Sequence, residues 1–224
     1  MEAIKRNVEK IKEELKNGNK YGEKVVLVAA TKMQTAEAIN RAIEAGVDAV
    51  AENKPQEFRD KNEFLLPCPR HFIGHLQTNK IKYLLGKISL YHSCDRDDLA
   101  TELARQSQNK GLVSDILIQI NIGEEESKGG YAYETAKEVY SRLSKTEGLK
   151  VKGFMAMLPE NGTEETLRAL VRKMRDLFDW AKMQSKEVEY LSMGMSGDYA
   201  LCIEEGSNMV RVGSTIFGAR DYGK

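Results

Sequence analysis

The segment VVLVAATK, residues 25–32, starts with an unbroken apolar run and ends in a lysine. An apolar run without alternation is typical of a strand buried on both faces, as in the parallel sheets of α/β proteins. Lys32 then stands at the carboxyl end of this strand, where α/β barrels gather their functional side chains. In a partly desolvated pocket a lysine can lose its proton and act as a nucleophile, whereas a loop lysine in water stays a solvated cation. This segment alone leaves both interpretations open.

The same pattern repeats along the chain, because short apolar runs alternate with longer amphipathic stretches such as residues 163–183. Eight runs are predicted to be strands, at residues 25–31, 48–51, 71–74, 88–92, 116–120, 151–157, 189–192 and 209–212. Eight strand–helix alternations predict an α/β fold with a single (β/α)₈ TIM-type barrel, one domain over residues 1–224. A doubly wound open sheet is the alternative, but it usually carries a glycine-rich turn after its first strand. Residues 31–34, TKMQ, contain no glycine, which favours the barrel.

Composition restricts the class of protein. The 224 residues carry 34 basic and 34 acidic side chains and no formal net charge, which gives no electrostatic case for nucleic acid or an anionic membrane as partner. No apolar stretch approaches the ~20 residues that span a bilayer, and the N-terminus lacks the apolar core of a signal peptide. The 3 cysteines are far apart and form no CxxC pair, as is usual in a reducing cytoplasm. A soluble cytoplasmic protein is therefore expected.

Two segments near the C-terminus are rich in small and hydroxyl residues: SMGMSGD, residues 192–198, and VRVGSTIFG, residues 210–218. We expect Asp198 to cap a helix that runs to Gly206. Backbone N–H groups and a hydroxyl at a helix start suit a phosphate dianion. Barrels often form phosphate sites from the loops after their seventh and eighth strands, and these are those loops. Ordinary turn chemistry explains either segment alone, but the pair favours a phosphate site.

Barrel closure would join this phosphate site to Lys32, because the first strand neighbours the eighth. An amine nucleophile and a phosphate cradle would then face one cavity. A phosphorylated aldehyde that forms a Schiff base is the simplest ligand for such a cavity, and pyridoxal phosphate is the common example.

Six motifs spread over nearly the whole chain carry a family resemblance. They are VAATKMQ around Lys32, AENKPQEF around Asn53, HFIGHLQTNK around His75, GFMAM around Met155, SMGMSGD around Ser196, and VRVGSTIFGARDY. With these motifs the chain resembles the pyridoxal phosphate homeostasis protein family, which is related to the N-terminal barrel domain of alanine racemase. The last two motifs are highly specific as a pair.

The resemblance implies roles for eight residues toward pyridoxal 5'-phosphate. Lys32 would form the Schiff base, and Arg211 would contact the pyridine nitrogen. The phosphate would be held by Ser196, Gly213 and Ser214. The pocket would also be lined by Asn53, His75 and Met193.

Other polar candidates give no metal site. His71 and His75 are four residues apart, and on a strand this spacing separates them by about 13 Å, too far to share an ion. His75 remains a candidate pocket residue, and His71 is expected to be structural. The loop from Glu124 to Gly130 could bind an effector, although a solvated charged loop is the simpler interpretation.

Two classes of function compete: a carrier of pyridoxal phosphate and an amino-acid racemase. Racemisation needs two acid–base groups on opposite faces of the substrate carbanion. In alanine racemase the resemblance implies that the second group is a tyrosine, in an arrangement completed by a further domain and a dimer partner. With the eighth predicted strand close to Lys224, we expect no such further domain, and nothing marks Tyr199 or Tyr222 as the base. We therefore expect a non-enzymatic, monomeric protein that buffers pyridoxal phosphate or delivers it to apo-enzymes.

Overall fold

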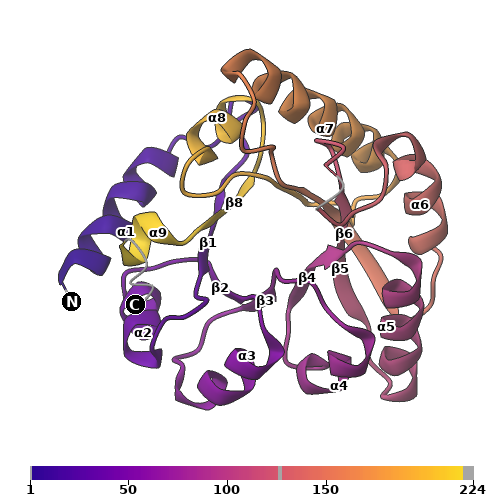
Figure 1. Cartoon of the computed structure of the whole chain (residues 1–224), viewed down its shortest axis with the longest axis horizontal. Helices are drawn as coiled ribbons and strands as arrows, with labels where there is room; N and C mark the ends of the chain where they lie inside the picture. The colour runs from indigo at the N-terminus through magenta and orange to yellow at the C-terminus, as the bar shows by residue number, and fades with distance from the viewer. Residues whose placement is uncertain (1, 126–127, 219–224) are drawn as a thin grey trace.

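The computed structural model describes residues 2–125 and 128–218. Its strands form a closed barrel in chain order, and each strand is parallel to its neighbours. Figure 1 shows this ring of strands at the centre, with the helices around it. The predicted (β/α)₈ barrel is confirmed. The strands are β1 Val26–Ala30, β2 Ala49–Glu52, β3 Arg70–Phe72, β4 Leu90–Cys94, β5 Ser114–Ile120, β6 Leu149–Ala156, β7 Tyr190–Ser192 and β8 Met209–Val212.

The helices cover the outside of the barrel. In Figure 1, α1 at the start of the chain lies beside α2 and beside the yellow α9, and both contacts belong to the structure. None of the helices within the two described ranges is long and apolar enough to cross a membrane. The α-helices are α1 Glu2–Leu15, α2 Ala36–Glu44, α3 Pro55–Lys61, α4 Ile81–Leu84, α5 Asp97–Asn109, α6 Ala136–Leu143, α7 Glu164–Gln184, α8 Tyr199–Glu204 and α9 Ser214–Phe217. In the described part of the chain, 3₁₀ turns lie at Asn62–Phe64, Thr78–Lys80 and Tyr133–Thr135.

Helix starts follow the expected capping chemistry at α2 and α7. Thr35 accepts a hydrogen bond from the Ala38 N–H, and Thr163 accepts one from Thr166, so each satisfies a backbone donor of the first turn. The prediction that Asp198 caps α8 was wrong for its side chain. Asp198 occupies the N-cap position, but its carboxylate accepts from the Met195 N–H and closes the preceding turn instead.

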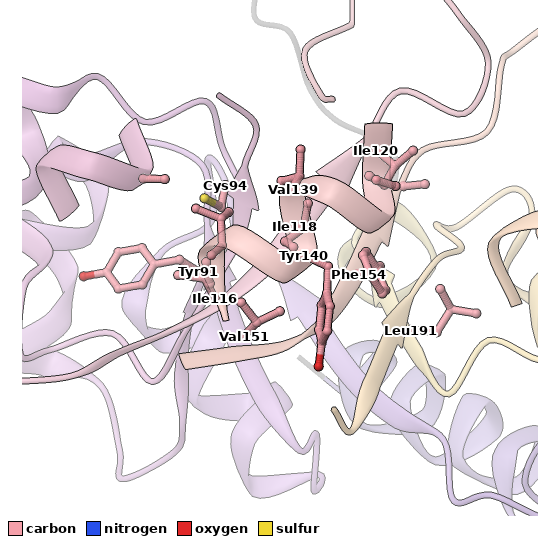
Figure 2. Close-up of a cluster of buried hydrophobic side chains, with 14 of the residues drawn as sticks. Tyr91, Cys94, Ile116, Ile118, Ile120, Val139, Tyr140, Val151, Phe154 and Leu191 are labelled. Carbon is pink, nitrogen blue, oxygen red and sulfur yellow. The ribbon is translucent and has the colours of Figure 1, made fainter. Parts of the chain in front are cut away.

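Most of the hydrophobic core lies between the barrel and the helices. Figure 2 shows one part of it, where Ile116 and Ile118 of β5, Phe154 of β6 and Tyr140 of α6 gather. Phe154 is completely buried, and the Tyr140 ring lies 6.1 Å from it, between ring centroids. Removing a side chain of this size from water stabilises the fold by roughly 1.5–3 kcal/mol.

The barrel interior is a second, smaller core with polar members. Successive side chains of a strand alternate between the interior and the helix layer. The apolar interior cluster contains Val28, Ala49, Ala51, Leu90, Leu117, Met155 and Met209. Two residues further along their strands come His92 after Leu90 and Arg211 after Met209, and both are buried. The interior is therefore not filled by hydrocarbon alone.

Gly153 of β6 lies at an irregularity in the pairing of β5 with β6 and has a φ of 140°. A Cβ at this position would stand 1.9 Å from the Tyr190 carbonyl oxygen of β7. Gly153→Ala should lower the free energy of unfolding by about 3 kcal/mol, because the backbone is strained and the clash is with another strand. Urea denaturation measures this change.

Gly111→Ala is the matched control. Gly111 has a φ of 64°, but a Cβ added there would meet no atom within 4 Å. Its loss should be about 1 kcal/mol, from the left-handed conformation alone. Equal losses at the two positions would contradict the role given to the close approach of β7.

Candidate functional site

A cavity of about 280 Å³ opens at the carboxyl ends of the strands. It is lined by the side chains or backbone of Ala30, Lys32, Asn53, Ile73, Met157, Met195, Ser196, Gly197, Arg211, Gly213 and Ser214. Six of the eight predicted site residues are therefore brought together: Lys32, Asn53, Ser196, Arg211, Gly213 and Ser214. Their roles toward a cofactor stay predictions.

Lys32 is partly buried, and the residues on both sides of it are anchored to neighbouring elements. The Thr31 hydroxyl lies 3.0 Å from the Ala51 carbonyl oxygen and 2.8 Å from Glu52 Oε1 at the end of β2. The Met33 N–H donates to Glu57 of α3 at 2.7 Å, and Met33 adopts a φ of 63°. This left-handed turn is held by a carboxylate, so the position of Lys32 is fixed from both sides.

An ion cluster on the helix side of β2 supports this turn. Lys61 Nζ donates to Glu52 at 2.8 Å, to Glu57 at 2.7 Å and to the Thr31 carbonyl at 3.3 Å. Burial raises the pKa of Glu52 despite the bond from Lys61. For Glu57, the bonds from Lys61 and Met33 outweigh partial burial and lower the pKa. The sequence interpretation missed this cluster, although the i,i+4 spacing of Glu57 and Lys61 was visible.

Ser196 joins the loops that follow β7 and β8. Its hydroxyl oxygen accepts from the Gly213 N–H at 3.1 Å and from the Thr215 N–H at 3.3 Å. The two donors belong to the start of α9. An oxygen atom at the cavity wall is thus already held by backbone N–H groups in the loops predicted to bind phosphate.

Arg211 brings a buried positive charge to the cavity. Its side chain donates from Nη1 to the Ser192 carbonyl at 2.8 Å and to Ser192 Oγ at 2.7 Å, and from Nη2 to the Ala156 carbonyl at 3.3 Å. No carboxylate bonds to it within residues 2–125 and 128–218. Burial lowers its pKa to about 10, against the influence of Cys202 and Asp198, so Arg211 stays a cation at neutral pH.

Asn53 lines the cavity from the end of β2. Its Oδ1 atom is buried and has no hydrogen-bond partner among the described residues. Buried acceptors are normally satisfied, so this oxygen has capacity for a donor in the cavity.

The structure does not bring His75 or Met193 to the cavity. The His75 side chain is 64% exposed, and its Nδ1 lies 3.0 Å from Asp95. Met193 is fully buried in the outer core, because it follows Ser192 and so faces the helices. His71, which was expected to be structural, is buried with its Nδ1 3.0 Å from Nε2 of His92.

Two other predicted features lie away from the cavity. In the acidic loop, Glu125 pairs with Lys128, which also donates to the Leu158 carbonyl at 3.2 Å. The Tyr199 hydroxyl donates to Glu14 on the outer surface. Residues 126–127 of the loop, and residues 219–222 of the last motif with Tyr222, lie outside the described residues.

The ionisable groups of the cavity are few. Among the described residues, Lys32 and Arg211 are the members of its lining that carry a titratable side chain. No histidine, tyrosine or carboxylate of the described ranges lines it. The described lining therefore presents an amine, a guanidinium and hydroxyl groups, and within residues 2–125 and 128–218 it contains no second acid–base group of the histidine, tyrosine or carboxylate type.

Comparisons with known proteins agree with this description. A family model described as "Alanine racemase, N-terminal domain" matches residues 1–221. The "Pyridoxal phosphate homeostasis protein" of Aquifex aeolicus is 38% identical over 224 residues, which cover 99% of this chain and 98% of the relative. The protein of the same name from Escherichia coli K12 is 35% identical over 207 residues, 90% of this chain and 88% of its own. These relatives are named for homeostasis and not for a catalysed reaction, which agrees with the expectation of a non-enzymatic protein.

Solved structures give the same fold. PipY of Synechococcus elongatus is 28% identical and matches 96% of this chain and 100% of its own, with a TM-score of 0.83 for the structure with PLP bound. Its structure without PLP gives a TM-score of 0.86. An alanine racemase of Clostridium difficile has a TM-score of 0.76 at 16% identity, and the match covers all of this chain and 61% of the racemase. That likeness concerns the fold alone.

The buried histidines predict how stability depends on pH. Burial lowers the pKa of His71 from 6.5 to about 4, and burial with the nearby His71 and Arg211 lowers that of His92 further. The unfolded chain therefore binds more protons than the fold between these values, and stability should fall as pH drops from 6.5 toward 4. Each group contributes at most about 1.4 kcal/mol per pH unit.

Denaturation midpoints at about pH 7, about pH 5.5 and about pH 4.5 measure this slope. His71→Asn keeps an acceptor near the position of Nδ1 but removes one of the two titrating rings. Its slope should be shallower than that of the parent protein. An unchanged slope would show that His71 is not the group responsible.

Proposed function

This chain belongs to the pyridoxal phosphate homeostasis protein family, and we propose on that premise that it binds pyridoxal 5'-phosphate as a Schiff base on Lys32. In this proposal it holds the cofactor reversibly and buffers or supplies it to apo-enzymes that need it. The observation that carries the proposal is that Lys32, Arg211 and the Ser196–Gly213 pair line one cavity.

The amine end of the cavity suits an aldehyde. A primary amine condenses with an aldehyde to an imine and water, and the reaction is reversible in water. Lys32 is partly buried, and Thr31 and Met33 are anchored to β2 and α3, so the amine is presented from a fixed turn. Reversible condensation at a fixed amine is what a holding protein needs.

The loops after β7 and β8 suit a phosphate. Ser196 already accepts from two backbone N–H groups at the start of α9, and Ser214 and Gly197 of the same loops also line the cavity. A phosphate oxygen near the Ser196 hydroxyl would find the same donors. The positive charge of Arg211 favours an anion in the same cavity.

The ring of the cofactor would lie between the amine and the phosphate-binding loops. An arginine carries donors only, so Arg211 would offer N–H to a pyridine nitrogen that keeps its lone pair. Asn53 Oδ1, which is buried without a partner among the described residues, would accept from a hydroxyl of the ligand. A pyridine ring whose nitrogen is not protonated is a weaker electron sink and stabilises a substrate carbanion less. Such a ring suits a protein that holds the cofactor better than one that uses it for carbanion chemistry.

The lining also supports holding over racemisation. Racemisation requires acid–base groups on both faces of the substrate, and the described part of the lining contains only Lys32 and Arg211 as titratable side chains. Of the two tyrosines weighed for the second base, Tyr199 donates to Glu14, and partial burial with that carboxylate raises its pKa to about 12, while Tyr222 lies outside the described residues. We propose that the binding unit is a single-domain monomer.

Reduction with borohydride tests the covalent link. Purified protein loaded with pyridoxal phosphate should be yellow, and borohydride should fix a pyridoxyl group on the peptide that contains Lys32, as mass spectrometry of a digest would detect. Lys32→Ala should lose the yellow absorbance and the label and should keep the melting temperature, because the side chain is not part of the core. Lys54→Ala, at an exposed lysine of the next loop, is the matched control and should keep both. A label on another lysine would refute the assignment.

An assay for racemisation separates the two classes of function. Cofactor-loaded protein incubated with L-alanine in deuterium oxide should show no exchange at Cα beyond that of free pyridoxal phosphate, because no second acid–base group lines the described cavity. Proton NMR follows the exchange, and an alanine racemase serves as positive control. Exchange at Cα that exceeds the rate with free pyridoxal phosphate and is lost in Lys32→Ala would show that the protein is a catalyst and would refute the holding function.

A further inference from the structure

A line of buried polar side chains crosses the barrel interior from the cavity toward the opposite end. It runs from Arg211 of β8 through Ser192 of β7 and His92 of β4 to His71 of β3. Arg211 Nη1 lies 2.7 Å from Ser192 Oγ, which lies 3.1 Å from His92 Nδ1, and His92 Nε2 lies 3.0 Å from His71 Nδ1. Ser192 and His92 have no exposed surface, and Arg211 and His71 are 4% and 7% exposed.

This line has a direction that follows from its first member. A guanidinium has donors only, so Ser192 Oγ must accept from Arg211. The serine hydroxyl then needs an acceptor of its own, and His92 Nδ1 is the atom within reach in the described structure. His92 consequently carries its proton on Nε2 and donates to His71 Nδ1, which leaves the proton of His71 on Nε2. In the opposite direction the buried Ser192 hydroxyl would have no acceptor, at a cost of about 1–3 kcal/mol.

Both rings are neutral at neutral pH, so each holds one proton and the direction is unambiguous. Burial lowers the pKa of both rings, and the charge of Arg211 lowers that of His92 as well. At the far end, the His71 ring lines a second cavity of about 400 Å³ at the amino ends of the strands. Its Nε2 has no protein partner among the described residues, so this N–H faces the solvent of that cavity.

We propose that Ser192 and His92 are positioning residues that hold the Arg211 guanidinium in one orientation at the cofactor cavity, through a relay in which both histidines are Nε2–H tautomers. The need for them follows from the partners of Arg211. Within the described ranges its acceptors are two carbonyl oxygens and one hydroxyl, and no carboxylate fixes the charge. Ser192 supplies two of these three acceptors on the same nitrogen. Only the effect on cofactor binding rests on the proposed function, because the tautomers belong to the protein alone.

The tautomers are tested in cofactor-free protein. Long-range ¹H–¹⁵N NMR of ¹⁵N-histidine protein at neutral pH distinguishes the protonated from the unprotonated ring nitrogen. The proposal expects Nε2–H for His71 and for His92, assigned with single-histidine variants. An Nδ1–H tautomer at His92 would reverse the direction of the relay and overturn the proposal. The spectrum of the parent protein gives this result without a ligand and without any substitution in the relay.

Matched pairs of variants test the effect on Arg211. Ser192→Thr keeps the hydroxyl and Ser192→Ala removes it, while His92→Asn keeps an acceptor near the position of Nδ1 and His92→Leu removes it. The Ala variant should bind pyridoxal phosphate about tenfold more weakly than its Thr partner, the loss expected for one hydrogen bond to a charged group. The Leu variant should bind it more weakly than its Asn partner by a smaller factor, because the bond it loses is to the neutral Ser192 hydroxyl. They should also shift the ¹⁵N resonance of the bound pyridine nitrogen, which a merely structural change elsewhere would leave in place. Variants are compared after their melting temperatures show that they are folded.

The outcomes separate this inference from the proposed function. If the parent protein takes up no cofactor at Lys32, the proposed function fails, and the tautomer measurement still decides the direction of the relay. A second outcome is that the parent protein binds the cofactor and all four variants match it in affinity and in the ¹⁵N resonance of the pyridine nitrogen. In that case Ser192 and His92 do not position Arg211. If a truncated variant fails to fold, the signals of the Arg211 guanidinium in the conservative variants serve instead. Arg211 guanidinium resonances of Ser192→Thr and His92→Asn that match those of the parent protein support the relay, and broadened resonances contradict it.

Discussion

Parallel pairing of β1 with β8 closes the barrel, and the site depends on this closure. The pairing sets Val28 beside Arg211 in register, although the two strands come from opposite ends of the chain. Lys32, at the mouth of β1, then lies at the same cavity as Arg211 and the loop that starts α9. An open sheet of the same strands would leave Lys32 and the loop that starts α9 at two separate edges. Lys32 and the loop after β8 lie far apart in the sequence, and they line one cavity because β1 pairs with β8.

The barrel interior has a packed apolar part and a polar part beside the cavity. The small residue Ala30 at the upper level of the interior lines the cavity, while Leu117 and Met155 fill the interior below. A buried arginine without a carboxylate partner in the described ranges is costly, because a desolvated charge must be compensated. Hydrogen bonds to Ser192 and Ala156 offset part of that cost. The outer core already stabilises the fold. The interior can therefore hold the Arg211 guanidinium, although its burial costs free energy.

Periodicity and fold rules predicted most of the fold and the centre of the site. Eight apolar runs gave the eight strands, with β4 two residues later than expected, at Leu90–Cys94, where its register with β5 shifts. Position at a strand end predicted that Lys32 and Arg211 would lie at one cavity, and both line it. The same rule did not hold for His75, whose ring turns outward to Asp95 after another strand, or for Met193, which strand alternation points at the helices. The contact of His92 with Ser192 joins β4 to β7, and no local pattern encodes a contact across the barrel.

The chemistry open to this cavity follows from how few titratable groups line it. Within the described residues they are an amine and a guanidinium, accompanied by an amide and hydroxyls. An amine can bond reversibly to an aldehyde, and the guanidinium and backbone donors attract an anion, but neither group moves a proton between two faces of a bound substrate. Alanine racemase shares the barrel fold, so the fold itself does not decide between holding a cofactor and using it. Racemisation would need a second acid–base group near the amine; of the two tyrosines weighed for that role, Tyr199 donates to Glu14 on the outer surface, and Tyr222 lies outside the described residues.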